Sequence, residues 1–189
     1  MIKKLLVSAM CILLSERTLG QDATGMSARP PAPPPRENVE QQVAAARTKL
    51  WKSQAYGIQL LVPATWKQLT PNESEIVSFA APNKEIVSIR AYRGLLFGSA
   101  DDARQRLEAG LRNQFPKMKV VSSRVVAVNG IETADIVLSG LIGTSSGIYR
   151  GISFHNETNS FIMTCFYLPK DEKLFGEVVN SVLGTVSFN

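Results

Sequence analysis

Three consecutive apolar runs in the second half of the chain have the pattern of β-strands: residues 131–142, 147–155 and 160–168. In the last run both faces of the strand would be apolar, with Phe161, Met163, Cys165 and Tyr167 on one and Ile162, Phe166 and Leu168 on the other. A strand that is apolar on both faces has to be covered on both sides. The pattern therefore predicts a sheet with helices above and below it.

Turn signals join these runs into a meander. Asn129 and Gly130 separate strand patterns at 118–128 and 131–142, and Asn-Gly is a strong signal for a tight hairpin. Turn-forming residues at 143–147 and 155–159 make two more hairpins. Shorter strand patterns precede them at 56–62, 66–69, 75–80 and 85–93. We therefore expect an α+β fold, an α/β/α sandwich in which helices cover both faces of an antiparallel β-sheet of about six or seven strands with a C-terminal three-hairpin meander.

Two segments have the spacing of amphipathic helices. In residues 99–115, Ala103, Leu107, Leu111 and Phe115 form one apolar stripe, and Ser99 is placed to cap the first turn. Residues 171–183 carry a wider apolar face, and Gly184 is expected in the left-handed conformation that often ends a helix.

The N-terminal residues 1–20 have the arrangement of a secretory signal peptide: two lysines, an apolar run over 5–14 and a small-residue site before Gln21. The run is shorter than the ~20 residues of a membrane span. No stable membrane span is therefore expected after signal cleavage, and the chain is predicted to be exported to the periplasm or secreted. Anchoring as a lipoprotein through Cys11 is not expected, because cleavage there would split the apolar run.

Residues 21–36 are rich in proline and lack the apolar side chains of a core, so we expect a disordered, extended linker. It is interpreted as a spacer, with a docking peptide as the alternative. Residues 37–52 carry Val39, Val43, Ala46 and Leu50 at helical spacing and predict a short helix or a partly ordered segment. The globular domain is expected over residues 55–189.

Charge and cysteine content argue against a nucleic-acid partner and against an internal disulfide. The formal net charge of +5 becomes +3 once the signal, with three positive and one negative residue, is removed. The remaining basic residues are scattered, whereas nucleic-acid binding normally needs a basic stripe, so no nucleic-acid partner is expected. After signal cleavage Cys165 is the one cysteine left, which excludes an internal disulfide, and its strand context predicts a small buried side chain.

The segment from Tyr56 to Trp66, with its glycine, proline and closing tryptophan, resembles the opening of the PsbP-like superfamily. That superfamily includes photosystem extrinsic proteins, DcrB-type lipoproteins, Ran-binding Mog proteins and effector chaperones. The resemblance continues through the helix at 99–115, the Asn-Gly hairpin and the closing helix, and covers residues 56–189. It implies an antiparallel sheet between helices and, in most members, binding or assembly without catalysis. It implies no site residues, because members use different surfaces.

No catalytic or metal-binding constellation is predicted. His155, the single histidine, lies in a turn, and no Gly-x-Ser-x-Gly elbow accompanies it. Zinc would need further His or Cys ligands, and the glycines at 140, 143 and 147 lack the Lys-Ser/Thr of a phosphate loop. We therefore assign no catalytic residue, no metal and no cofactor.

Six residues are candidates for binding. Leu95, Leu96 and Phe97 lie between two glycines just before a helix. Exposed, they would contact a partner or lipid; buried, they would close over the core, and burial is the interpretation we favour. Arg90, Tyr149 and Arg150 are either strand residues with solvated polar ends or part of a polar binding face.

The sequence therefore predicts an exported, non-enzymatic accessory domain that binds another protein at the cell envelope. The alternative is a carrier or chaperone that holds a lipid or an apolar peptide segment between sheet and helices. A hydrolase is the third possibility, and it would need a cleft with coupled ionisable groups around His155.

Overall fold

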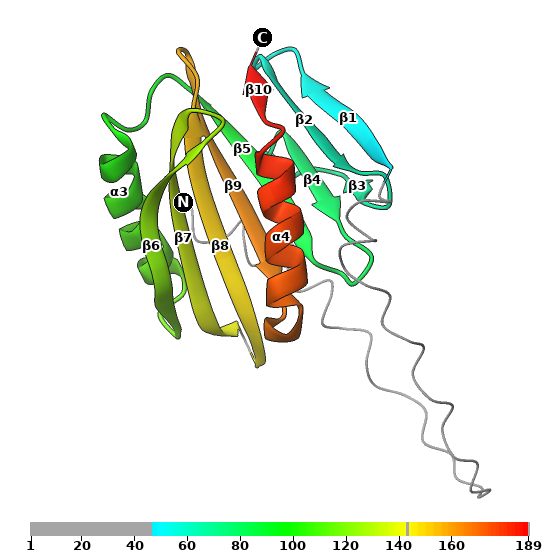
Figure 1. Cartoon of the computed structure of the whole chain (residues 1–189). Helices are drawn as coiled ribbons and strands as arrows, with labels where there is room; N and C mark the ends of the chain where they lie inside the picture. Colours follow the sequence, from blue (N-terminus) through cyan, green and yellow to red (C-terminus); the bar gives the residue numbers. More distant parts are fainter. Residues whose placement is uncertain (1–46, 143, 189) are drawn as a thin grey trace, which may run out of the picture. The chain divides into compact units, whose positions relative to one another are not determined.

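A computed structural model of the chain describes residues 47–142 and 144–188, which form two antiparallel sheets. The larger has the strand order β3-β4-β5-β9-β8-β7-β6 and the smaller the order β1-β2-β10 (Figure 1). The strands are β1 (Thr48–Ser53), β2 (Ile58–Pro63), β3 (Lys67–Leu69), β4 (Val77–Ala80), β5 (Ile86–Arg93), β6 (Met118–Val128), β7 (Ile131–Ile142), β8 (Ser145–His155), β9 (Asn159–Tyr167) and β10 (Ser187–Phe188). The helices are α3 (Ala100–Gln114), the short 3-10 turn η2 (Pro169–Asp171) and α4 (Glu172–Leu183).

The predicted fold class is confirmed. Strands β6 to β9 pair in sequence through three hairpins, and the Asn129–Gly130 turn has positive φ at both residues, +52° and +77°. This is the conformation that a two-residue hairpin matching the strand twist requires.

The two helices lie on opposite faces of the large sheet. Phe175 of α4 contacts Tyr167 of β9 with ring centroids 5.2 Å apart, so α4 covers the face that carries Phe161, Met163 and Cys165. On the other face, Leu111 of α3 packs so closely on β8 that a Cβ added at Gly151 would lie 3.0 Å from its side chain. We call these the α4 face and the α3 face.

The main core lies on the α4 face, between the large sheet, α4 and the small sheet. Ile58, Leu60 and Val62 of β2 are fully buried there. The α3 face is less completely covered, and Ile162, Thr164 and Phe166 are half-buried. Helix α3 packs over β6, β7 and β8. The two-sided cover predicted for β9 is therefore complete on the α4 face and only partial on the α3 face.

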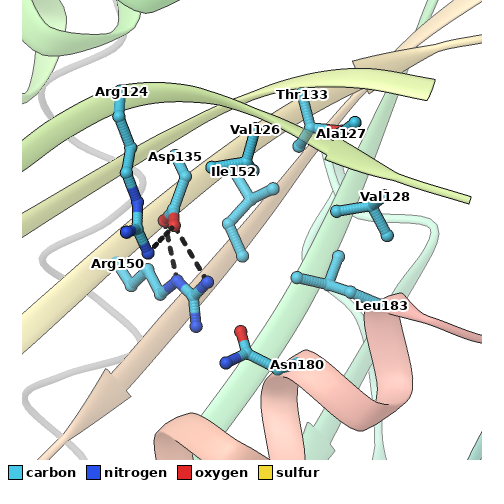
Figure 2. Close-up of a pocket in the computed structure, with 10 residues that line it drawn as sticks. All are labelled: Arg124, Val126, Ala127, Val128, Thr133, Asp135, Arg150, Ile152, Asn180 and Leu183. Atoms are coloured by element: carbon cyan, nitrogen blue, oxygen red, sulfur yellow. Dashed lines mark hydrogen bonds and ion pairs between the residues drawn. The ribbon is translucent and has the colours of Figure 1, made fainter. Parts of the chain in front are cut away.

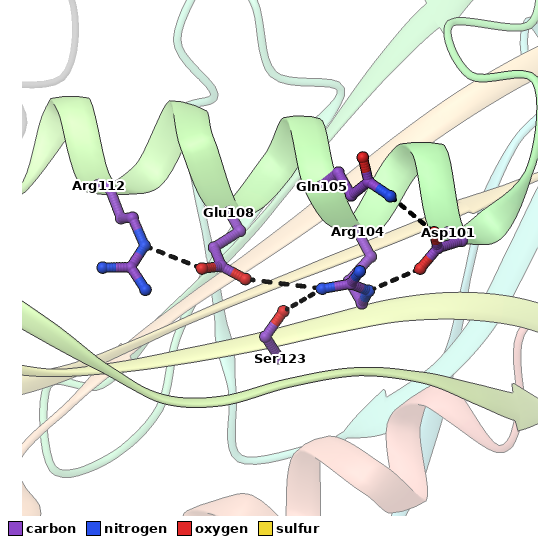
Figure 3. A network of polar contacts seen from close by, with 6 residues as sticks. All are labelled: Asp101, Arg104, Gln105, Glu108, Arg112 and Ser123. Atoms are coloured by element: carbon purple, nitrogen blue, oxygen red, sulfur yellow. Dashed lines mark hydrogen bonds and ion pairs between the residues drawn. The ribbon is translucent and has the colours of Figure 1, made fainter.

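Helix α3 begins and ends as its sequence predicts. The Ser99 hydroxyl accepts a hydrogen bond from the Asp102 amide at 3.1 Å, and the amide of Phe115 closes the last turn. Its polar side is a network that reaches the sheet: Arg104 bonds Asp101 at 2.8 Å and the Ser123 hydroxyl of β6 at 3.1 Å, and Arg112 bonds Glu108 at 2.8 Å (Figure 3).

Two local predictions are wrong. Residues 48–51 are not helical: they belong to β1, which pairs along its whole length with β2, and Trp51 packs edge-on against Phe79. The spacing that fits a helix here is overridden by this partner strand. Gly184 is not left-handed, with φ −60°, because the end of α4 is closed instead by Thr185, whose hydroxyl donates to the Val182 carbonyl at 2.7 Å.

The predicted signal peptide, the proline-rich linker and residues 37–46 lie outside the described residues. Within the described part of the chain, no helix is long and apolar enough to cross a membrane.

Candidate functional site

A hollow of about 190 Å³ opens on the α4 face, between α4 and the strands β6, β7 and β8 (Figure 2). Its lining combines three charged side chains with an apolar wall. The lining residues are Arg124, Val126, Ala127, Val128, Thr133, Asp135, Arg150, Ile152, Asn180 and Leu183.

Strand register brings the charged residues together. Arg124 of β6 pairs with Asp135 of β7, and Arg150 of β8 lies one diagonal step from Asp135. The position of Arg124 depends on a β-bulge, since the register of β6 shifts between Val120 and Ser122. Before the bulge in the sequence, the even-numbered residues of β6 point to the α3 face. After the bulge, the even-numbered residues point to the α4 face. The bulge therefore places Arg124 beside Asp135.

Asp135 and Arg150 form a buried two-point ion pair. Arg150 donates from Nε to Asp135 Oδ1 at 2.7 Å and from Nη2 to Oδ2 at 3.0 Å. Their side chains are 1% and 8% exposed. Burial disfavours the charged guanidinium, but the hydrogen bonds and charge of Asp135 outweigh it, and the pKa of Arg150 is raised above its ordinary value. The Arg150 guanidinium therefore stays charged.

Arg124 stands at the rim of the hollow. Its side chain is 61% exposed, and its contact with Asp135 Oδ2 is long, at 3.4 Å. On the opposite rim, Asn180 extends from α4 toward the two arginines (Figure 2). Two guanidinium groups and one carboxylate give the lining a net charge of +1, which favours an anion.

The β6–β7 turn fixes one end of this arrangement. Asn129 donates from its side-chain amide to the carbonyl oxygens of Gly184 and Val186 at 2.6 and 3.3 Å. These bonds tie the residue after Val128 to the residue after Leu183, so the strand wall and the helix wall are joined where the hollow ends.

The structure separates the six residues proposed from the sequence. Arg150 lies in the hollow, but Arg90 and Tyr149 lie on the α3 face, because neighbouring residues of a strand point to opposite faces. Arg90 is mostly buried, 3.9 Å from Glu75. Tyr149 is buried with its ring 4.6 Å from that of Phe115, and burial raises the pKa of its hydroxyl to about 12. A single polar face containing all three is therefore not formed.

The two leucines of the Leu95–Phe97 loop are exposed and Phe97 is half-buried, so the expectation that the loop closes over the core is wrong for the leucines. Leu95 and Leu96 are 57% and 40% exposed. The loop is held in place by polar bonds: the Ser160 hydroxyl accepts from the Leu96 amide at 2.9 Å and donates to the Gly94 carbonyl at 3.1 Å. These bonds satisfy the backbone without burying the leucines. Contact of this loop with a partner stays a prediction.

Arg124, Asp135 and Asn180 were not singled out from the sequence. Asp135 carries the clearest signal, because it is a carboxylate in the middle of the apolar strand 131–142, whereas the other charge, Glu132, lies next to the turn. A buried carboxylate needs a cationic partner. Arg124 and Asn180 resemble ordinary solvated residues, and no local pattern marks them.

Other reactive groups do not assemble into a catalytic centre in the described residues. His155 is exposed, and its ring Nδ1 lies 3.3 Å from the Asn156 carbonyl. Cys165 is buried as predicted, and burial raises the pKa of its thiol to about 12. No group of three or more His, Cys, Asp or Glu residues in these ranges is placed to hold a metal ion.

The fold is that of the PsbP-like class, and comparison with solved structures supports this fold assignment. The chain has a TM-score of 0.61 with cyanobacterial PsbP (CyanoP) from Synechocystis, at 11% identity over 76% of this chain and 94% of that one. It has a TM-score of 0.59 with LpqN of Mycobacterium tuberculosis, at 10% identity over 82% and 99%. With the Saccharomyces cerevisiae Ran-binding protein Mog1p the TM-score is 0.57, at 9% identity over 76% and 96%.

These similarities define the fold, which is the PsbP-like fold predicted from the sequence. No family model matches the sequence, and no curated protein matches it either. At about 10% identity the shared fold assigns no activity, so function has to be argued from the surface and the hollow.

Proposed function

We propose that this protein is an exported, non-enzymatic accessory domain that binds another protein at the cell envelope. The observation that carries the proposal is the small, net-positive hollow beside α4, on a face where core side chains such as Phe161, Met163 and Phe175 are buried. Its size is below the ~300–1,000 Å³ of pockets that take drug-sized ligands. A site of this size fits a group presented by a larger partner.

The fold analogy supports the same conclusion. Mog1p is named as a Ran-binding protein, and LpqN is described as involved in cell envelope biogenesis. Both are neighbours in fold alone, so they support the class of function and not its partner. The secretory pattern of residues 1–20 supports the envelope location.

The carrier alternative needs room between sheet and helices. On the α4 face, Phe175 and Val179 of α4 are buried against the sheet, and Trp66 stacks on Phe175 with centroids 5.9 Å apart. A lipid chain would have to displace these side chains, so binding of a partner on the surface is the stronger proposal.

The proposal is tested in the source cells with the full chain and a C-terminal epitope tag. A photo-crosslinking amino acid is placed at Asn180 beside the hollow, at Leu95 on the exposed loop, and at Lys84 in the β4–β5 turn as a control. We expect the chain in the envelope fraction without residues 1–20, and a discrete crosslinked protein from position 180 or 95 that is missing from position 84.

Two results would contradict the proposal. One is a cytosolic chain that keeps Met1, which would remove the export. The other is a stoichiometric lipid found by native mass spectrometry of the purified protein, with no crosslinked protein at either position, which would favour a carrier.

A further inference from the structure

The hollow beside α4 has a charged end and an apolar end. Arg124 and Arg150 point into the charged end around Asp135, and Val126, Val128 and Leu183 make the apolar wall (Figure 2). An anion with a short apolar stem would match both ends. The hollow is thus complementary in charge and polarity to a single acidic side chain.

Both arginines keep hydrogen-bonding capacity for such a group. The bonds of Arg150 to Asp135 use Nε and Nη2, and among the described residues Nη1 has no partner. Arg124 makes its one long contact from Nη2, and most of its side chain is in solvent. A guanidinium with free N–H groups binds a carboxylate at two points, so an incoming carboxylate can share the two arginines with Asp135.

The size of the hollow decides between small and large occupants. Its volume of about 190 Å³ corresponds to roughly six water molecules at ~30 Å³ each. This room suits the methylene groups and carboxylate of one side chain.

The backbone decides between an acidic side chain and a chain terminus. Terminal carboxylates are usually held by clusters of free backbone N–H groups. Strands β7 and β8 have neighbours on both sides in the sheet, so their backbone groups are paired within it. The two cations of the hollow are side chains, and no cluster of free backbone N–H groups on β7 or β8 accompanies them. The site therefore lacks on these strands the feature that selects a chain terminus.

From these observations we propose that the hollow binds an aspartate or glutamate side chain of a protein partner, with Arg124 and Arg150 as the recognising cations. The inference rests on the proposed function, since it names the chemistry of the partner.

The test is an NMR titration of the full chain, labelled with 15N, that follows backbone amides and the arginine Nε–H groups. Three probes are used: an acetylated, amidated pentapeptide with a central glutamate between two valines, the same peptide with glutamine, and a valine-ended peptide with a free carboxylate. We expect the glutamate peptide alone to shift signals of Arg124, Thr133 and Asn180.

Variants give the test its specificity. Arg124→Glu should weaken binding of the glutamate peptide by at least about tenfold, because an attractive charge becomes repulsive. Lys119→Glu is the matched control: it makes the same charge change on the same strand, is exposed, and forms no ion pair within the described residues, so binding should stay within about twofold. Asn180→Glu, on the opposite rim, should also weaken binding.

Equal binding of the glutamate and glutamine peptides would overturn the site, as would equal loss in Arg124→Glu and Lys119→Glu, or binding of the chain-end probe alone.

The two proposals fail separately. If a crosslinked partner is recovered unchanged with Arg124→Glu, the carboxylate site is wrong and the binding function stands. If the peptide binds but no partner is crosslinked in cells, the site stands and the function is wrong.

Discussion

Asp135 illustrates how one buried charge determines its surroundings. A carboxylate that is 1% exposed is stable in its ionised form only beside a cation, and Arg150 provides two hydrogen bonds in the required planar geometry. Arg124 adds a weaker contact from solvent. Asp135 and Arg150 therefore support the fold as a pair, while Nη1 of Arg150 and most of the Arg124 guanidinium are left for a ligand.

Removing one member of the buried pair should be costly. In Asp135→Ala the Arg150 guanidinium is left buried without its partner, and we expect a loss of roughly 3–5 kcal/mol in the free energy of unfolding. Urea denaturation followed by circular dichroism measures this loss.

The double variant Asp135→Leu with Arg150→Met replaces the pair by apolar groups of similar volume and should be more stable than Asp135→Ala. Arg124→Ala is the exposed control and should cost less than about 1 kcal/mol. A double variant as unstable as the single one would show that the pair is not coupled.

Two glycines differ in how closely neighbouring backbone approaches the position of a Cβ atom. At Gly140 of β7, φ is +155°, and an added Cβ would lie 2.6 Å from the Lys117 carbonyl oxygen and 2.8 Å from the Met118 Cα. The start of β6 lies against this backbone, so a side chain here would push the two strands apart. At Gly110 in the middle of α3, an added Cβ would meet nothing within 4 Å.

The two alanine variants should therefore change stability in opposite directions. Gly110→Ala should stabilise the protein by about 0.5–1 kcal/mol, because alanine loses less backbone entropy in a helix. Gly140→Ala should destabilise it by roughly 1–3 kcal/mol through the displaced backbone. Thermal unfolding of both variants beside the unchanged chain measures the difference. A stabilised Gly140→Ala would mean that β6 and β7 do not approach as closely as described.

Local signals explain which elements could be predicted. The Ser99 cap and the four-residue spacing located α3, and the Asn129–Gly130 turn located the first hairpin, because each signal acts within a few residues. The segment at 48–53 could not be predicted as a strand, since its pairing with β2 competes with an equally good helical pattern. The small sheet was missed because β10 pairs with a strand far away in the sequence.

The candidate site was less predictable than the fold. Arg150 was identified as a candidate, but the other charged residues of the hollow lie on two other strands. Arg124 reaches the α4 face only through the bulge near Val121. A bulge changes the face of every later residue, and its position is set by the neighbouring strand. Simple alternation along β6 would therefore have placed Arg124 on the wrong face.

At the scale of the whole molecule, β2 joins the two ends of the described chain. It lies between β1, the first described strand, and β10, the last. Its buried residues Ile58, Leu60 and Val62 belong to the same core as α4 and the α4 face of the large sheet. The small sheet should therefore unfold together with the large one as a single cooperative unit.

Phe188 provides the test of this cooperativity. It lies on β10 opposite Ile58, with its ring 5.7 Å from that of Phe161 and 6.4 Å from that of Phe154 in the large sheet. Because the ring is half-buried, Phe188→Ala should cost roughly 2 kcal/mol, less than a fully buried phenylalanine. Leu50→Ala on the opposite edge of the small sheet, where the side chain is 58% exposed, is the control and should cost less than about 0.5 kcal/mol.

Hydrogen exchange then shows whether the two sheets unfold as one cooperative unit or as two independent units. If the core is shared, Phe188→Ala lowers the protection of the slowest amides in β2 and in β8 and β9 by the same free energy, because all of them exchange through global unfolding. If protection falls in β1 and β2 while β8 and β9 are unchanged, the small sheet opens independently, and the shared core described here does not couple the two sheets.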